Sequence, residues 1–421
     1  MAYTDFIAAI DLGTSHMVGM VGTKNATGAL SIIAYEVENS GSCIRRGCVY
    51  NVKETASKIK RLILKLENKL GGTKIGQVYV GLGGQSLRSI EHTVCKVLGT
   101  EGVVTEEIID SLYQECKDYR PDMLTVLDVV SPSYFLDDKP ESNPVGVPCS
   151  RIEARYKLIV GRPSLKLNIV NSISEQAKIE IAGILVSPLA LGDVVLSDNE
   201  KDLGCALIGF GAGVTTISVY KGGKLASLSV VPFGGNLITK DITNLRVVES
   251  EAERLKITYG SAKADRDNDM TIQVSLADGM GLREIKLAEL NGVIEARMDE
   301  ILENVYARLE ATGLMSVLGA GIVITGGGAA LKNLPAVMSE RLKMEVRYSA
   351  VRKGVVASGD LVVASNPEYA VAVGLLAKGT KNCALYIPPK PEPKIEPVVE
   401  PEPTVEPTPE PEPVKEKPKK E

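Results

Sequence analysis

Residues suited to chemistry are concentrated in two glycine-rich loops, one in each half of the chain. The first reads Ile10-Asp11-Leu12-Gly13-Thr14-Ser15 and the second Ile208-Gly209-Phe210-Gly211-Ala212-Gly213, each between two apolar runs. Glycine lets backbone N–H groups approach an anion closely, so each loop is typical of a β-hairpin that binds phosphate. The carboxylate of Asp11 is suited to orient Mg²⁺ through water, unless it is only a turn residue at a strand end. Gly209, at the matching position, has no such group.

A third glycine motif, Gly326-Gly327-Gly328, follows the apolar run 321–325 and precedes a predicted helix. A glycine-rich turn between a buried strand and a helix can lie flat under a purine or a phosphate. Each loop alone indicates little more than a tight turn. Two facing phosphate hairpins followed by strand, triple glycine and helix are together typical of the actin/Hsp70/hexokinase superfamily of nucleotide-binding proteins.

The elements that must position these loops are predicted as two α/β lobes. In the first, hydrophobic patterning predicts strands over 6–10, 17–21, 30–37 and 77–82, with a helix over 52–70. Residues 85–163 interrupt this pattern with a helix over 105–118, strands over 124–130 and 152–160 and a loop over 137–148. A helix over 164–182, closed by Gly183, returns to it.

The second lobe repeats the first in outline. Strands are predicted over 205–209, 215–220, 224–232, 270–275 and 321–325, and helices over 237–244, 248–258 and 287–312. The predicted fold is therefore α/β and actin-like, with two ribonuclease-H-like lobes around a nucleotide cleft. Its predicted parts are 1–84 (first lobe), 85–163 (inserted subdomain), 164–192 (return helix), 193–385 (second lobe, with an outer subdomain at about 240–310) and 386–421.

Composition limits the remaining possibilities. The last of these parts is a Pro/Glu/Lys repeat holding 12 of the 22 prolines, expected to be a disordered linker. A net charge of −5 and a pI near 5.5 argue against nucleic acid as a partner. Seven scattered cysteines without a CxxC pair, beside only two histidines, predict free thiols rather than a zinc site.

Eight segments resemble the bacterial actin-like cell-division family FtsA, over essentially residues 5–380. They are IDLGTS (10–15), VYVGLGG (78–84), SPLALGDVVL (187–196), VPFGGNLITKDI (231–242), AERLKITYG (252–260), IEARMDEIL (294–302), ITGGGAAL (324–331) and NPEYAVAVGLL (366–376). The insertion also falls where that family has its own small subdomain. The resemblance implies ATP binding with Mg²⁺, self-association into filaments, and recruitment of the FtsZ ring and other division proteins. It further implies a peripheral location on the cytoplasmic face of the membrane at the division site, through a C-terminal anchor that we expect lies outside this sequence.

The resemblance also assigns roles by position. The residues expected to contact phosphate or water-bound Mg²⁺ are Asp11, Gly13, Thr14, Ser15, Gly211, Gly213 and Thr215. Those expected near the rest of the nucleotide are Gly234, Gly235, Asn236, Glu253, Lys256, Gly326, Gly327 and Gly328. Glu253 and Lys256, one helical turn apart, are alternatively an exposed ion pair that contributes little. His16 stands where the family often has a longer basic side chain.

Two departures from the family pattern bear on mechanism. Ser187 stands where Hsp70-like relatives and many family members have Glu, and Gly209 where the second hairpin usually has Asp. Because loss of a water-orienting group can lower a hydrolysis rate by orders of magnitude, we expect ATP binding with very slow or absent turnover. No catalytic residue is assigned. The alternatives are an active ATPase, such as an Hsp70-like enzyme, and a pilus-type scaffold of the same fold.

The family places its partner site in the lobe that contains the helix over 287–312. Arg297 and Arg308 are therefore candidates to bind the acidic C-terminal tail of FtsZ. Both could equally be solvent-facing residues of that helix.

Overall fold

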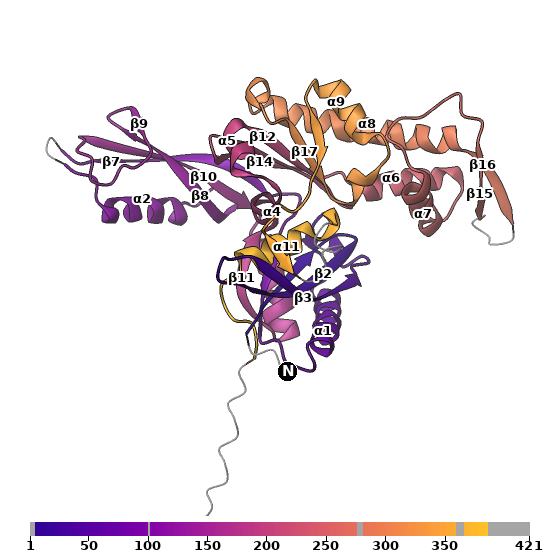
Figure 1. The fold of residues 1–421 in the computed structure, drawn as a ribbon, viewed down its shortest axis with the longest axis horizontal. Helices are drawn as coiled ribbons and strands as arrows, with labels where there is room; N and C mark the ends of the chain where they lie inside the picture. Colours follow the sequence, from indigo (N-terminus) through magenta and orange to yellow (C-terminus); the bar gives the residue numbers. More distant parts are fainter. Residues whose placement is uncertain (1–4, 100–101, 276–280, 359–365, 386–421) are drawn as a thin grey trace, which may run out of the picture. The chain divides into compact units, whose positions relative to one another are not determined.

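The computed structural model describes residues 5–99, 102–275, 281–358 and 366–385 (Figure 1). The linker predicted over 386–421 lies outside the described residues. In the part of the chain that is described, no helix is long and apolar enough to cross a membrane.

The first lobe is built on a six-stranded sheet. Its order is β11 (Glu180–Val186), β6 (Gln77–Leu82), β1 (Ile7–Leu12), β2 (His16–Lys24), β3 (Leu30–Asn39) and β19 (Val356–Ser358). Strands β1, β2 and β3 form an antiparallel ladder, whereas β6 runs parallel to β1 and β11 parallel to β6. The four predicted strands and the helix α1 (Val52–Lys69) are confirmed. Strand β6 is buried along nearly its whole length, as expected for a parallel strand with covered faces.

The second lobe repeats this plan in a five-stranded sheet. Its order is β14 (Lys224–Val231), β13 (Thr215–Lys221), β12 (Cys205–Phe210), β17 (Ile322–Thr325) and β18 (Val346–Tyr348). Again three consecutive strands form an antiparallel ladder, and two parallel strands extend it beyond the first of them. The internal duplication predicted from the loops is thus present in the sheet topology.

Between β6 and the return to the first sheet lies the insertion, with its own sheet and core. Its strands are β7 (Arg88–Val97), β10 (Arg151–Gly161), β8 (Thr125–Leu136) and β9 (Lys139–Glu141), in that order, with helix α2 (Glu106–Asp118) against them (Figure 1). The side chain of Thr105 caps α2. A separate cluster of buried residues, including Leu112, Ile152 and Leu158, holds this unit together.

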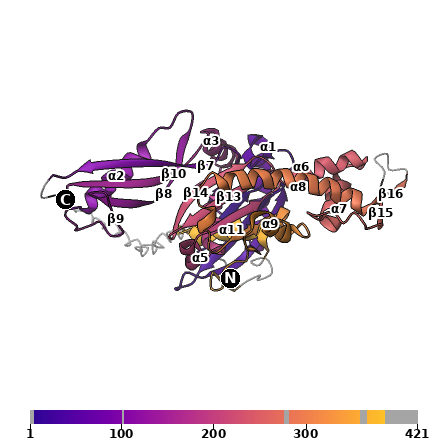
Figure 2. The ribbon, with the colours of Figure 1, turned by 90° about the horizontal axis from the view of Figure 1, so that it is seen from above.

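Further helices are present in the described part of the chain. They are α3 (Ser164–Val170, continuing as a π-helix over Asn171–Ala177), α4 (Ser187–Val195), α5 (Asp198–Leu203), α6 (Gly235–Ile242), α7 (Glu249–Tyr259), α8 (Leu287–Glu310), α9 (Leu334–Leu342) and α11 (Ala370–Lys378). Helix α8 packs on β13 and β14, with the apolar face from Leu290 to Leu309 buried (Figure 2). Two hairpins complete the fold: β4 (Ile44–Arg45) with β5 (Cys48–Val49), and β15 (Thr271–Ser275) with β16 (Leu282–Lys286).

Three local predictions are wrong. The helix predicted over 164–182 ends at Ala177, because Lys178 adopts a left-handed conformation (φ 61°) that closes it. Residues after it form β11, in which Gly183 packs against the Tyr79 ring rather than capping a helix. The loop predicted over 137–148 contains the short strand β9.

The predicted extent of the second lobe, 193–385, also differs from the structure at its C-terminal end. Strand β19 pairs with β3 at the edge of the first sheet, and α11 packs on β1, β2 and α4. Ala372, Val373 and Leu375 of α11 are fully buried there. The chain therefore returns to the first lobe, a long-range packing choice that local patterning does not encode. All seven cysteines are free thiols, as predicted.

Candidate nucleotide-binding site

Both predicted glycine loops are tight hairpin turns, between β1 and β2 and between β12 and β13. A side chain at Gly13 would place its Cβ 2.5 Å from the carbonyl oxygen of His16, so only glycine fits there. In the second turn, the N–H of Gly211 donates a hydrogen bond of 2.9 Å to the carbonyl oxygen of Val214. Glycine thus lets the backbone of each turn fold tightly, as is typical of anion-binding turns.

The two hairpins touch each other. A Cβ at Gly213 would lie 2.6 Å from the hydroxyl oxygen of Thr14 and 3.0 Å from the Cα of Arg46. Glycine therefore allows the tip of the second hairpin to approach the first as closely as it does. The predicted facing of the two loops is present in the structure.

A third element, the β4–β5 turn, joins this contact, and sequence reasoning missed it. The N–H of Gly47 donates a hydrogen bond of 2.9 Å to the hydroxyl oxygen of Thr14. A Cβ at Gly47 would lie 3.0 Å from Gly84, at the start of the insertion. The available sequence signal was the pattern Arg-Arg-Gly-Cys between two apolar residues, which is consistent with a two-residue hairpin turn. In the structure Gly47 adopts the left-handed conformation (φ 70°) that such a turn requires.

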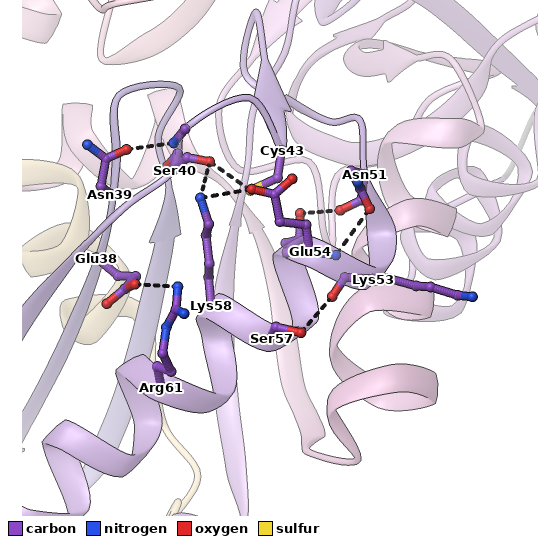
Figure 3. Close-up of polar contacts among 12 residues, drawn as sticks. Glu38, Asn39, Ser40, Cys43, Asn51, Lys53, Glu54, Ser57, Lys58 and Arg61 are labelled. Carbon is purple, nitrogen blue, oxygen red and sulfur yellow. Dashed lines mark hydrogen bonds and ion pairs between the residues drawn. The ribbon is translucent and has the colours of Figure 1, made fainter. Parts of the chain in front are cut away.

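The first hairpin is supported from behind by Ser40, whose polar link to helix α1 is shown in Figure 3. The buried hydroxyl of Ser40 donates a hydrogen bond of 2.7 Å to the carbonyl oxygen of Gly13, and its N–H donates one of 3.0 Å to that of Ser15. The ammonium of Lys58 donates one of 2.9 Å to the carbonyl oxygen of Ser40 and pairs with Glu54 at 3.0 Å. Helix α1 is thereby tied to the loop that precedes it.

Asp11 lies at the C-terminal end of β1, where burial raises the pKa of its carboxyl from 3.8 to about 6. One of its oxygens is 3.2 Å from the position that a Cβ at Gly81 would take, and the hydroxyl oxygen of Ser187 is 2.5 Å from that position. The absence of a side chain at Gly81 therefore leaves room for both groups. A desolvated carboxylate near a phosphate-type loop is suited to a cation.

Gly234, Gly235 and Asn236, at the start of α6, pack directly on the second hairpin. The N–H of Gly235 donates to the carbonyl oxygen of Gly211 at 3.0 Å, and that of Asn236 to Ala212 at 2.8 Å. A Cβ at Gly234 would lie 2.5 Å from the carbonyl oxygen of Gly211. The structure thus brings these three residues to the hairpin, and their place near the nucleotide stays a prediction.

Glu253 and Lys256, on α7, form an ion pair of 2.6 Å that is more than a surface contact. The Lys256 side chain is only 12% exposed, and its ammonium also donates to the hydroxyl oxygen of Thr239 (2.8 Å) and the carbonyl oxygen of Gly235 (3.2 Å). The hydroxyl of Thr239 in turn hydrogen-bonds Glu253. This cluster therefore adjoins the second hairpin through Gly235.

The triple glycine packs against Phe210, at the end of the strand that leads into the second hairpin. Gly326 adopts φ 85°, and a Cβ there would be 2.5 Å from the carbonyl oxygen of Phe210. A Cβ at Gly328 would lie 2.9 Å from the Phe210 Cβ, and one at Gly327 would lie 2.9 Å from a carboxylate oxygen of Glu368. Gly327–Ala330 is a 3₁₀ turn, so the predicted helix begins only at α9.

Two predicted residues have structural contacts of their own. The hydroxyl of Thr215 is buried and donates to the carbonyl oxygen of Phe233 at 2.9 Å. A Cβ at Gly209 would lie 2.7 Å from the hydroxyl oxygen of Thr216, so a larger residue there needs that side chain to move.

The two partner candidates on α8 differ sharply. Arg297 forms ion pairs with Asp241 (2.5 Å) and Glu300, so its charge is already neutralised. Arg308 is exposed, has no hydrogen bond or ion pair with any described residue, and lines a cavity of about 300 Å³ together with Arg88 and Leu228. Arg308 is the one of the two that has its donors available.

Among the described residues, no group of three or more His, Cys, Asp or Glu side chains is placed to hold a metal ion. The duplicated sheets, the two touching hairpins and the triple-glycine turn together define an actin-like protein.

Solved structures show the same fold. Over 88% of this chain it resembles a chain of the PilM-PilN type IV pilus biogenesis complex (97% of that chain, TM-score 0.62, 16% identity). The MamK double helical filament (88% and 97%, TM-score 0.51, 11% identity) and MreB5 of Spiroplasma citri bound to ADP (88% and 95%, TM-score 0.50, 14% identity) are also similar. At these identities the likeness concerns the fold.

Sequence relatives give the family. The family model for Cell division protein FtsA matches residues 206–374. Cell division protein FtsA of Porphyromonas gingivalis is 39% identical over 382 residues, which cover 90% of this chain and 79% of that relative. That of Bacillus subtilis is 32% identical over 392 residues, or 91% and 86%. The chain belongs to the FtsA family of actin-like cell division proteins, which confirms the predicted family and fold.

Proposed function

We propose that this chain binds ATP with Mg²⁺ at the two hairpins and acts as a nucleotide-gated adaptor of the division ring. The observation that carries the proposal is the contact of Gly213 with Thr14, because it brings two phosphate-type turns from different lobes together. Such a pair can grip phosphates from both sides.

Different residues of this chain would contact different parts of the nucleotide. Backbone N–H groups of Gly13, Thr14 and Ser15 would face the phosphates from one lobe, and those of the Gly211–Gly213 turn from the other. Asp11 would orient the waters of Mg²⁺, which supplies charge neutralisation to the phosphates. The Glu253–Lys256 cluster, with Gly234–Asn236 and Gly326–Gly328, would hold the ribose and base. Thr215 would act by fixing the end of the second hairpin.

Hydrolysis is proposed to be very slow or absent. The hydroxyl of Ser187 and the carboxylate of Asp11 both lie beside Gly81. In this proposal Ser187 occupies the position where a carboxylate would be needed to orient the attacking water. A serine hydroxyl is a much weaker base than a carboxylate, so the attacking water gains little activation. The nucleotide then acts as a ligand that shifts the equilibrium between lobe arrangements, which requires only a difference in affinity.

In this proposal the adaptor self-associates into filaments and recruits FtsZ and other division proteins at the inner face of the membrane. Arg308, rather than Arg297, would bind the acidic C-terminal tail of FtsZ, since Arg297 is already paired. The insertion at 85–163 would serve as a separate interaction subdomain because it has its own core.

Two experiments test this function. Filament formation is measured by sedimentation with ATP, with ADP and without nucleotide; we expect assembly to depend on nucleotide.

Binding of a labelled FtsZ tail peptide is compared between Arg308→Glu and Arg297→Glu. The larger loss is expected for Arg308→Glu, and equal binding by wild type and Arg308→Glu would contradict the partner assignment. Rapid ATP turnover would instead favour an ATPase.

A further inference from the structure

The β4–β5 turn contains a strained arginine. Arg45 pairs with Cys48, so the turn has only two residues, Arg46 (φ 49°) and Gly47 (φ 70°). Positive φ at both positions is the geometry of a type I′ turn, which prefers Asn-Gly or Gly-Gly. A long side chain in the left-handed region costs free energy, and such residues are concentrated at functional sites.

This turn contacts both phosphate hairpins at once. Gly47 donates its N–H to Thr14 of the first hairpin at 2.9 Å. The Cα of Arg46 is 3.0 Å from the position of a Cβ at Gly213 of the second. The backbone of Arg46 therefore lies where the two hairpins meet.

The charge of Arg46 is not neutralised. Its guanidinium donates one hydrogen bond, of 3.2 Å, to the neutral side-chain amide of Gln85, and no carboxylate pairs with it among the described residues. Its neighbour Arg45, in contrast, lies 3.8 Å over the ring of Tyr50. A single exposed hydrogen bond to a neutral acceptor contributes little, so the side chain can exchange it for a stronger partner.

The two hairpins themselves supply no fixed positive charge to the proposed phosphate site. Neither hairpin, over 10–16 or 208–216, contains Lys or Arg. Lys256 adjoins the second hairpin but is paired with Glu253. Within residues 10–16 and 208–216 an anion would thus meet backbone N–H groups, hydroxyls and the His16 imidazole, but no Lys or Arg, and Arg46 lies next to both hairpins.

We propose that Arg46 binds the terminal phosphate of a nucleoside triphosphate and distinguishes it from a diphosphate. This inference rests on the proposed nucleotide function. Phosphate binding would account for an arginine at a turn position where asparagine or glycine would be less strained. It also connects the phosphate to the insertion, because the carbonyl oxygen of Arg46 accepts a hydrogen bond of 3.1 Å from the N–H of Gln85.

The test uses the full chain and measures the affinities of ATP and ADP, each with Mg²⁺, by titration calorimetry. Arg46→Asn removes the charge while suiting the turn better, so its fold is expected to be at least as stable. We expect it to lose about tenfold or more in ATP affinity, the range for a hydrogen bond to a charged group, with little change for ADP. Arg46→Lys should recover part of the loss. Arg45→Asn is the matched control and should bind both nucleotides as wild type does.

Gln85→Ala separates this role from a structural one. If Arg46 serves only to hold Gln85, then Gln85→Ala and Arg46→Asn will lower both affinities equally. If Arg46 binds phosphate, Gln85→Ala will leave the ATP preference intact. Equal ATP affinity of wild type and Arg46→Asn would overturn the inference while leaving the proposed function standing. Absence of any nucleotide binding by wild type would overturn both.

Discussion

The hydroxyl of Ser40 donates a hydrogen bond of 2.7 Å to the carbonyl oxygen of Gly13, and so fixes the back of the first hairpin. Ser40 lies beyond β3 and is fully buried, whereas Gly13 lies in the turn after β1. With its carbonyl held from behind, the turn keeps its N–H groups directed to the other side. The phosphate loop is therefore positioned by the segment that leads into α1, and not by β1 and β2 alone.

Replacing Ser40 by Ala should loosen this loop. We expect a loss of about 0.5–1.5 kcal/mol in the free energy of unfolding, because a part-buried hydrogen bond is removed, and a lower affinity for ATP. Urea unfolding and nucleotide titration measure the two effects. Ser57→Ala, which removes only an exposed hydroxyl bonded within α1 (Figure 3), should change neither. Unaltered ATP affinity in Ser40→Ala would show that the network does not position the loop.

A methyl group at Gly81 should disturb the cation site directly. Gly81→Ala places a Cβ 2.5 Å from the Ser187 hydroxyl oxygen and 3.2 Å from an Asp11 oxygen, so one or both must move. Overpacking of this kind costs about 1–3 kcal/mol, and we expect ATP affinity to fall with it. Gly83→Ala is the control, since its Cβ would meet nothing within 4 Å. Similar behaviour of the two variants would argue against the placement of Asp11 and Ser187.

The raised pKa of Asp11 makes stability depend on pH in a defined direction. Between 3.8 and about 6 the folded protein retains a proton on Asp11 that the unfolded chain has released. The free energy of unfolding contributed by this group therefore decreases as pH rises through that window, and stays low above it. Asp11→Asn should remove that slope and be more stable than wild type near neutral pH, as measured by urea unfolding at several pH values.

The same variant tests the role of the carboxylate. If Asp11 orients Mg²⁺, ATP affinity in Asp11→Asn should no longer increase on adding Mg²⁺, although the fold is more stable. A variant that keeps the Mg²⁺ dependence would mean that Asp11 is a buried turn residue and nothing more.

Lys256 should matter for nucleotide binding in a way that a surface lysine does not. Lys256→Met removes the donor shared by Glu253, Thr239 and Gly235, next to the second hairpin. We expect weaker binding of ATP and ADP alike, because the cluster is assigned to the ribose and base and not to the terminal phosphate. Lys240→Met, on the exposed side of α6, is the control. Wild-type nucleotide affinity in Lys256→Met would show that Glu253 and Lys256 form only a structural ion pair.

Much of the fold could be predicted because it depends on local patterns. The apolar run at 77–82 and the amphipathic stretch from Val52 became β6 and α1 with nearly the predicted limits. Prediction failed where tertiary contacts decide: the apolar residues of 180–186 suit a strand or a helix, and pairing with β6 selects the strand. The return of α11 to the first lobe is decided in the same way, by packing against α4 and β1.

For the candidate site, the glycine motifs and their order were sufficient to place the hairpins, since glycine is needed where backbones approach. They were not sufficient to find the residues that support them. Ser40, Gly47 and Arg46 belong to a segment without a phosphate motif, and only its fold brings it to Thr14. Arg297 shows the converse, because its charge suggested a partner site and the structure pairs it with Asp241.

A single-sample experiment shows whether the chain binds ATP without hydrolysing it. Protein in excess is mixed with γ-labelled ATP and Mg²⁺, and bound nucleotide and released phosphate are followed in the same sample. We expect tight binding with the label still on the nucleotide after an hour. Rapid release of labelled phosphate would contradict it, and would show that Ser187 and Gly209 do not mark lost catalysis.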